Sequence, residues 1–329
     1  MTKTQRILIG LLIVQIIFAG VVFWPRNAVA VGQEPLFPGL NPDDVVRVSI
    51  ADNQGGSVEL ARQGDNWVLA SGGDYPANVS AITPILDKIA AVQTNRLVAQ
   101  TAVSQKQLQV AEDNFMRHVV LETSDGGTYD FYMGSSPSNN STHVRRADDQ
   151  ATYLVTDLNV YEMSQLASSW IDTAYVQMDQ ATVTAATLQN ANGTFTFHQT
   201  GSDDWMMDDL ADGEIFDRAQ FNLVLNRGFG LRMNNPLGKE ALPAYGMDNP
   251  QATLTLTGET DNATNTYTLQ VGAKLDNEDY VVKWSGSDYY VEVSPFTVEN
   301  LLNFDRTNFL ATPTPEAAAP AAGLATPSP

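Results

Sequence analysis

The sequence predicts an α+β fold, with two tandem repeats of antiparallel sheet with covering helices, preceded by one N-terminal transmembrane helix. A recurring spacing predicts the repeat. A lone tryptophan in a short apolar run is followed 67 residues later by a glycine that ends an alternating strand, first as Trp67 and Gly134, then as Trp205 and Gly272. No regular strand–helix alternation is visible, so an antiparallel arrangement is favoured over a doubly wound parallel sheet.

The length and composition of the chain agree with two domains. A chain of 329 residues can form two ordinary cores, and 43% hydrophobic residues is a value typical of folded proteins. We expect an N-terminal membrane anchor at 1–30, a spacer at 31–42, a first α+β repeat at 43–178, a second at 179–310, and a disordered Ala/Pro/Thr tail at 311–329.

The N-terminal segment predicts a membrane anchor. Residues 7–24 contain one polar residue, Gln15, and follow Lys3 and Arg6. As a helix they would span about 27 Å, enough for the hydrocarbon core, with the N-terminus cytoplasmic and the body extracytoplasmic. Ala28-Val29-Ala30 fits the alternative of a cleaved signal peptide, but the apolar run is longer than the usual signal core. In both cases the body is exported, and we expect a single-pass protein of the cell membrane.

Alternating residues and turn signals predict seven strands and two helices in the first repeat. A helix through Ile82, Leu86 and Ile89 is expected to be capped by Ser80 or Thr83. A closing helix, capped by Asp157, is expected to carry Leu158, Tyr161, Leu166 and Ala167 on or near one face. The strands are expected at 46–50, 58–60, 67–69, 119–121, 129–134, 143–145 and 153–155.

The second repeat has the same order. A helix capped near Asp217 is expected to bury Phe221, Val224 and Leu225, and Ser294-Pro295 is a good start for a last helix. The strands are expected at 183–188, 195–197, 205–207, 254–256, 267–272, 280–282 and 289–291.

Charge and cysteine content exclude several classes of function. The chain has 38 acidic and 18 basic residues, a net charge of −20, so it repels phosphate backbones and we expect no nucleic-acid partner. Cysteine is absent, which removes disulfides, thiolate metal sites and cysteine nucleophiles.

No motif assigns catalytic, cofactor-binding or metal-ligating residues. An acidic run could hold calcium, but aligning Asp208 with the first loop position puts Leu210 at a ligand position and Ala219 where a bidentate acid is needed, so a solvated turn is favoured. The run contains Asp203, Asp204, Asp208, Asp209, Asp212, Glu214 and Asp217. The three histidines, His118, His143 and His198, lack zinc-site spacing and are expected to be half-exposed strand residues.

Aromatic residues offer a second kind of candidate. Trp67 and Trp205 could stack on sugar rings, but their equivalent positions favour packing in the core. Because neighbours on a strand face opposite sides, either Tyr289 or Tyr290 should point outward and is a candidate for contact with a partner.

The Trp…Gly…Tyr landmarks, the segment from Tyr245 to Pro250 and the single anchor together resemble a bacterial family, domain of unknown function 4340. The resemblance covers about 43–310 and implies an N-terminal anchor and a tandem α+β body outside the membrane. Genes of the family often lie beside those of gliding-motility-type ABC transporters, which implies an accessory role and transporter subunits as partners. The family offers no catalytic residues to carry over. One departure is that Leu108 to Asp113 stands where the second repeat has Gly246 and Pro250, so a turn shaped by these two is expected only in the second copy.

We therefore expect a membrane-anchored extracytoplasmic binding or scaffold protein, accessory to an ABC-type transporter and without catalysis. The alternative is a cell-surface glycan hydrolase or glycan-binding module, which would use acids or aromatics between the two repeats. The sequence does not identify the ligand.

Overall fold

The computed structural model describes Gln15 and residues 34–94, 96–201, 204–260 and 263–311. The anchor predicted at 7–24 lies outside these residues apart from Gln15, and so do residues 31–33 of the spacer and 312–329 of the tail. Within the described ranges, no helix combines the length and apolarity that crossing a membrane requires.

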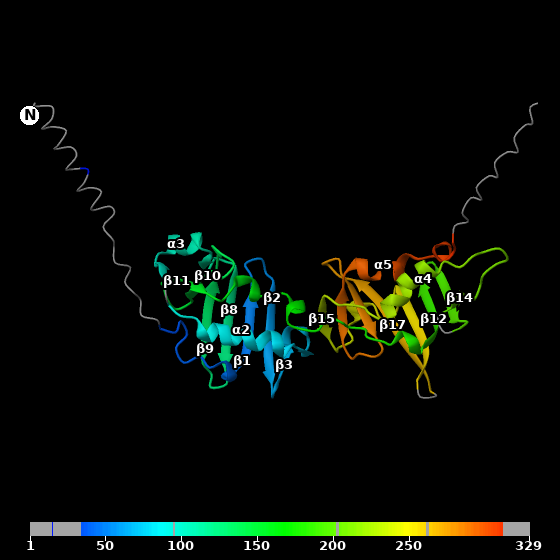
Figure 1. Cartoon of the computed structure of the whole chain (residues 1–329), viewed down its shortest axis with the longest axis horizontal. Helices are drawn as coiled ribbons and strands as arrows, with labels where there is room; N and C mark the ends of the chain where they lie inside the picture. Colours follow the sequence, from blue (N-terminus) through cyan, green and yellow to red (C-terminus); the bar gives the residue numbers. More distant parts are fainter. Residues whose placement is uncertain (1–14, 16–33, 95, 202–203, 261–262, 312–329) are drawn as a thin grey trace, which may run out of the picture. The chain divides into compact units, whose positions relative to one another are not determined.

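The chain divides into two compact units, Met1–Ser71 with Pro76–Trp170, and Gly72–Tyr75 with Ile171–Pro329 (Figure 1). Both are α+β, and every strand pairing described within the two large sheets is antiparallel, as predicted. The sheet of the first unit has the order β4-β3-β2-β1-β8-β9-β10-β11-β5. Its strands are β1 (Val45–Ala51), β2 (Ser57–Gln63), β3 (Asn66–Leu69), β4 (Tyr75–Pro76), β5 (Leu97–Ala99), β8 (Arg117–Thr123), β9 (Thr128–Met133), β10 (Ser141–Arg146) and β11 (Thr152–Thr156).

Helix α2 (Val79–Ala91) covers one face of this sheet (Figure 1). It buries Ile82, Leu86 and Ile89, the apolar stripe that the sequence predicts. The N-cap is Asn78, which accepts a hydrogen bond from the Ser80 N–H at 3.1 Å, so the prediction of a cap at Ser80 or Thr83 was wrong by at least two residues. The opposite face carries helix α3 (Ala102–Gln107) and the hairpin of β6 (Val110–Ala111) and β7 (Asn114–Phe115), which periodicity did not reveal because these elements are short.

The sheet of the second unit has the order β14-β13-β12-β16-β17-β18-β19-β15. Helices α4 (Arg218–Leu225) and α5 (Pro295–Asn303) lie over its apolar face, and α5 contacts β12 and β16. The strands are β12 (Val183–Asn190), β13 (Gly193–Gln199), β14 (Trp205–Met207), β15 (Asn235–Gly238), β16 (Ala252–Thr260), β17 (Ala263–Lys274), β18 (Tyr280–Trp284) and β19 (Tyr290–Val293).

The two sheets have the same strand order, position for position, once the extra edge strand β4 is set aside. In each, the central ladder joins a strand of the opening meander to a later one, β1 with β8 and β12 with β16. All fourteen strands expected from the sequence are present. The edge strands β5 and β15 were missed because each has at most four residues and no clear alternation.

The two glycines that first indicated the repeat have the same structural role. A Cβ on Gly134 would lie 2.1 Å from the Leu108 carbonyl oxygen, and a Cβ on Gly272 would lie 2.1 Å from that of Tyr245. Directly after β9, and near the end of β17, a crossing segment therefore lies against the strand backbone: the segment at Leu108 and Gln109 in the first unit and that at Tyr245 in the second. Only a residue without a side chain permits this approach.

The expectation that the turn at Gly246 occurs only in the second copy was wrong. Gln109 has φ of 58° and Gly246 has φ of 67°, so both copies have a left-handed residue at the same place. A turn with a left-handed residue at this place is therefore common to both repeats, with Gln109 in the first copy and glycine in the second. A non-glycine residue is uncommon in this region of backbone space, which explains why the sequence did not reveal the turn in the first copy.

The closing helix expected in the first repeat is absent from the described residues. Two 3-10 turns, η3 (Val160–Glu162) and η4 (Ala167–Ser169), take its place, whereas α5 forms as expected in the second repeat. Asp157 adopts φ of 65° and cannot act as the helix cap, and Asn159 caps η3 instead. The difference follows from the sequence, because Ser294-Pro295 presets a helix start and Asp157-Leu158 does not.

Candidate functional site

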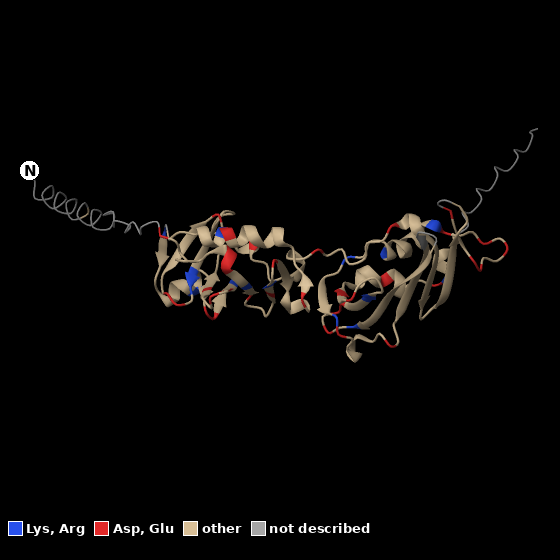
Figure 2. Ribbon diagram, turned by 90° about the horizontal axis from the view of Figure 1, so that it is seen from below, with Lys and Arg blue, Asp and Glu red and all other residues tan. Residues whose placement is uncertain are grey.

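The acidic run of the second unit is divided among separate structural contacts. Asp208 pairs with His198, Glu214 pairs with Arg306 at 2.5 Å, and Asp217 caps α4. Asp203 lies outside the described residues. Among the residues that are described, no group of three or more acids and histidines is arranged to hold a metal ion. The sequence has 38 acidic and 18 basic residues, and Figure 2 shows acidic residues on both units.

We expect replacement of Asp217 by alanine to lower the free energy of unfolding by about 1 kcal/mol, the usual loss for an N-cap. The Asp217 carboxylate accepts hydrogen bonds from the backbone N–H groups of Ala219 at 3.0 Å and Gln220 at 3.1 Å. Urea unfolding of the variant measures the loss. Asp212→Ala is the matched control in the same run, and an equal loss in both variants would contradict a capping role.

The three histidines lie on three different strands and each bonds to a near neighbour. His118 on β8 contacts Asp130 at 2.7 Å and stacks on Tyr132. His143 on β10 is only 9% exposed, so the expectation of a half-exposed residue was wrong there. Burial lowers the pKa of His143 below its ordinary value, and its Nδ1 lies 2.7 Å from the Ser135 carbonyl oxygen. The histidines do not come together in a common site.

Both repeated tryptophans are core residues, as predicted. Trp67 is 4% exposed and Trp205 is 5% exposed, and Trp205 packs against Phe221 of α4 with ring centroids 5.1 Å apart. These two side chains therefore supply no exposed stacking surface for a sugar ring. Their burial weakens the glycan-binding alternative and does not test the glycan hydrolase alternative, which rests on paired acids.

The tyrosines and the turn of the second unit also serve internal contacts. The Tyr289 hydroxyl donates to the Asp74 carbonyl at 2.9 Å, and the Tyr245 ring, 8% exposed, packs 5.2 Å from that of Tyr290. The carboxyl of Glu292 is half-buried on β19. Burial, and then the nearby charge of Asp279, raises the pKa of Glu292.

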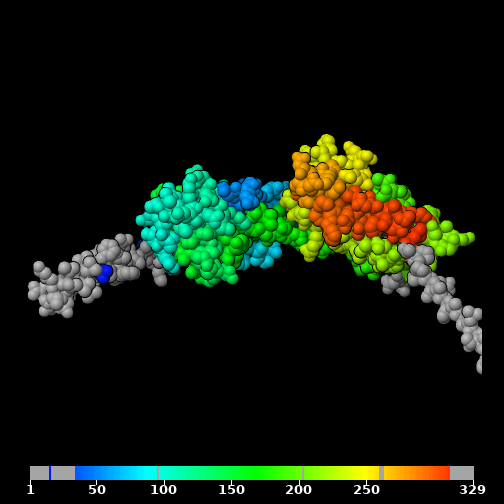
Figure 3. Space-filling view, turned by 90° about the horizontal axis from the view of Figure 1, so that it is seen from above, coloured from blue at the N-terminus to red at the C-terminus, as the bar shows by residue number. Residues whose placement is uncertain are grey.

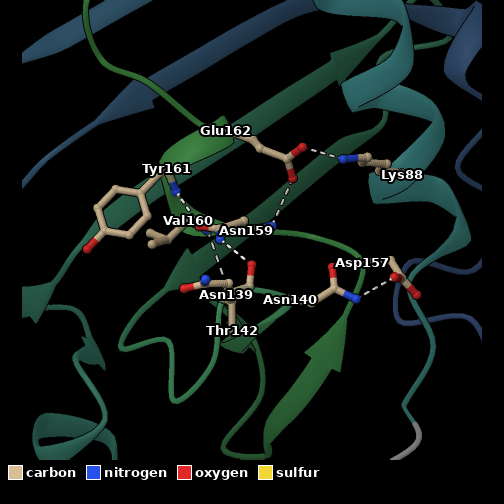
Figure 4. Close-up of polar contacts among 9 residues, drawn as sticks. All are labelled: Lys88, Asn139, Asn140, Thr142, Asp157, Asn159, Val160, Tyr161 and Glu162. Atoms are coloured by element: carbon tan, nitrogen blue, oxygen red, sulfur yellow. Dashed lines mark hydrogen bonds and ion pairs between the residues drawn. The ribbon is translucent and has the colours of Figure 1, made fainter.

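A polar network in the first unit holds the loop that follows β11 (Figure 4). Asn159 and Glu162 form a capping box around η3, and Glu162 also pairs with Lys88 of α2. The Asn159 side chain donates to the Asn139 carbonyl at 2.6 Å, and the Val160 N–H donates to the Thr142 hydroxyl at 3.2 Å. These bonds connect the loop to helix α2 and to the start of strand β10.

This network presents an aromatic side chain to solvent. Tyr161 is 70% exposed, and its ring points away from the Lys88–Glu162 pair (Figure 4). A cavity of about 290 Å³ adjoins the network between α2 and the end of β11, lined by Lys88, Ala91, Val92, Gln93, Thr156 and Asp157. The sequence placed Tyr161 on a covering helix, because helical spacing in a short apolar stretch cannot tell a buried face from an exposed loop.

The second unit has an exposed aromatic residue at a similar point of its topology. Phe296 lies in the first turn of α5, directly after β19, and is 71% exposed. Helix α5 and the following turn η8 (Arg306–Phe309), orange to red in Figure 3, form part of the molecular surface seen there.

A comparison with known families identifies the chain. The family model described as "Domain of unknown function (DUF4340)" matches residues 67–234, more than half of the sequence. The chain belongs to the DUF4340 family. The match begins at Trp67 on β3 and ends just before β15, so this DUF4340 protein contains family sequence in both units. No curated protein and no solved structure matches it.

Proposed function

We propose that this DUF4340 protein is a membrane-anchored, extracytoplasmic scaffold or binding subunit that accompanies an ABC-type transporter and catalyses no reaction itself. Residues 7–24 would form the anchor and the two acidic units would stand outside the membrane. The transporter enters the proposal through the family resemblance and the anchor through the apolar segment.

The observation that best supports a binding role is that Tyr161 is exposed while its backbone is held in place by hydrogen bonds. Aromatic residues dominate the energetics of protein interfaces because they bury a large area at a low cost in conformational entropy. Tyr161 is 70% exposed, yet its backbone N–H donates to the Asn159 side chain at 2.9 Å within the capping box. The loop is therefore ordered before any partner arrives, which lowers the entropic cost of association.

We expect Tyr161→Ala to reduce association with transporter subunits about tenfold or more, as truncation of an interface hot spot does. The measurement is co-purification of the full-length protein from detergent-solubilised native membranes, with the bound subunits quantified by mass spectrometry. Val103→Ala is the matched control, because Val103 is also 70% exposed but lies on α3. Failure of the wild-type protein to recover any transporter subunit would contradict the transporter role, and equal recovery by both variants would contradict the role of Tyr161.

A further inference from the structure

Strand β9 has a backbone edge that is only half occupied. Its partner β10 pairs with Phe131, Tyr132 and Met133, and one further bond joins the Ala147 N–H to the Asp130 carbonyl at 2.9 Å. Beyond this point the chain turns away from β9. The other edge of β9 pairs with β8 along its length, as far as Thr128.

The free edge exposes identifiable hydrogen-bonding groups. The Asp130 carbonyl points toward β10. In an antiparallel strand the N–H and C=O of one residue point to the same side, and so do those of the residue two positions away. The N–H of Asp130 and both backbone groups of Thr128 therefore also point to the β10 side. Among the described residues, none donates to the Thr128 carbonyl on this side or accepts from these two N–H groups. The edge therefore presents two donors and one acceptor at strand spacing.

A buried arginine holds the departing chain in its turn. Arg145 is 6% exposed, and its Nη1 donates to the carbonyls of Arg146 at 3.0 Å, Ala147 at 3.3 Å and Asp149 at 2.9 Å. The Ala147 carbonyl, which would otherwise be the acceptor for the Asp130 N–H, is thus directed to the guanidinium. The open edge follows from this arrangement.

The open edge lines a cavity of about 520 Å³, within the usual range for ligand sites. Phe37 and Tyr129 form an aromatic wall, with ring centroids 6.2 Å apart. At the rim Arg146 is already paired with Asp148 at 2.9 Å. Asp130, whose Oδ1 lies 2.7 Å from His118 Nε2, adds a second carboxylate that no lysine or arginine of the lining neutralises. The lining residues are Leu36, Phe37, Pro38, Thr128, Tyr129, Asp130, Arg146, Ala147 and Asp148.

The second unit closes the same position with a side chain. There the Ser285 N–H donates to the Thr268 carbonyl at 2.9 Å, as Ala147 does to Asp130. In addition, the Thr268 N–H donates to the Ser285 hydroxyl at 2.9 Å. Ala147 has no hydroxyl, so the first unit leaves open a donor that the second unit satisfies.

We propose that this slot, formed by β9 residues 128–130 and the cavity beside them, binds a short extended peptide that adds as a strand to β9. Side chains of a strand alternate between the two faces, and Tyr129 and Asp130 lie on opposite faces. The peptide therefore alternates apolar residues with basic residues. The apolar residues pack on Phe37 and Tyr129, and the basic residues are attracted by the Asp130 carboxylate and by the protein's net charge of −20. The site goes beyond the proposed scaffold function, because it requires neither an anchor nor a transporter.

The test uses full-length protein in detergent and three fluorescein-labelled, amidated pentapeptides with lysine at positions 1, 3 and 5 and valine, leucine or phenylalanine at positions 2 and 4. We expect saturable binding in fluorescence polarisation and slower amide hydrogen exchange at Thr128 and Asp130. Peptides methylated on their backbone nitrogens keep the side chains but lose donors, so they are expected to bind at least about fivefold more weakly.

The variant Ala147→Ser copies the closure seen at Ser285. We expect it to weaken binding about fivefold, the effect of one hydrogen bond, without changing the thermal unfolding midpoint by more than about 2 °C. Ala185→Ser on β12 makes the same change outside the slot and should leave binding unaltered.

Failure of all three peptides to saturate, or binding that Ala147→Ser and backbone methylation both leave unchanged, would overturn the peptide site. Neither result bears on co-purification with a transporter. Conversely, a failed co-purification would contradict the transporter role without affecting the peptide-binding result. The two proposals can therefore be contradicted independently.

Discussion

Arg145→Met is expected to lower the free energy of unfolding by about 3 kcal/mol or more, measured by urea denaturation with tryptophan fluorescence as the signal. The guanidinium is 6% exposed and donates to four backbone carbonyls, those of Arg146, Ala147 and Asp149 and, from Nε at 2.7 Å, that of Val110. It also lies 4.9 Å from the centre of the Tyr132 ring. Methionine fills much of the volume but leaves buried acceptors without donors.

The neighbouring residue supplies the control for this variant. Arg146 pairs with Asp148, and the side chain of Asp148 is 72% exposed, so Arg146→Met should change stability by no more than about 0.5 kcal/mol. Similar losses in both variants would show that the charge of this segment matters and the buried hydrogen bonds do not.

Gly272→Ala is expected to destabilise the second unit by about 3 kcal/mol. The added Cβ would lie 2.1 Å from the Tyr245 carbonyl oxygen and 2.7 Å from the end of the Met247 side chain. The methionine can move aside, but the carbonyl belongs to a turn fixed by Gly246 at φ of 67°. Thermal unfolding followed by circular dichroism measures the loss.

Gly201→Ala is the matched control, because a Cβ at Gly201 would meet nothing within 4 Å. We expect its unfolding midpoint to stay within about 2 °C of the wild type. If the Gly272→Ala protein were as stable as this control, the close packing of the Tyr245 carbonyl against the backbone of β17 would be contradicted.

The sequence predicted the repeated strands well because their signals are local and occur twice. Trp67 and Trp205 lie in apolar runs, and Gly134 and Gly272 end alternating segments, so each copy supports the other. The helix starts were predictable only where chemistry fixes them, as at Asp217 and Ser294. At Asp157 the same reasoning failed, because a left-handed backbone there is set by tertiary contacts, including the bond from Asn140 at 2.8 Å.

The candidate sites were much less predictable than the strands. Exposure of Tyr161 depends on the capping box of Asn159 and Glu162, which has no periodic pattern. The free edge of β9 depends on the side chain of Arg145 reaching carbonyls up to four residues away, and on the presence of alanine at 147 where the second copy has Ser285. Comparing the two repeats could have indicated that last difference, but only once their register was known.

The central ladders have a consequence for how the chain acquires its structure. Strand β1 ends at Ala51 and its partner β8 begins at Arg117, and a similar separation recurs between Asn190 at the end of β12 and Ala252 at the start of β16. During synthesis, the first three strands of each unit (β1–β3 and β12–β14) therefore cannot pair with β8 or β16 until the intervening helices and loops have been made. Closing so long a loop is entropically slow, so each sheet is expected to form late and all at once around its middle pair, with its first three strands exposed until then.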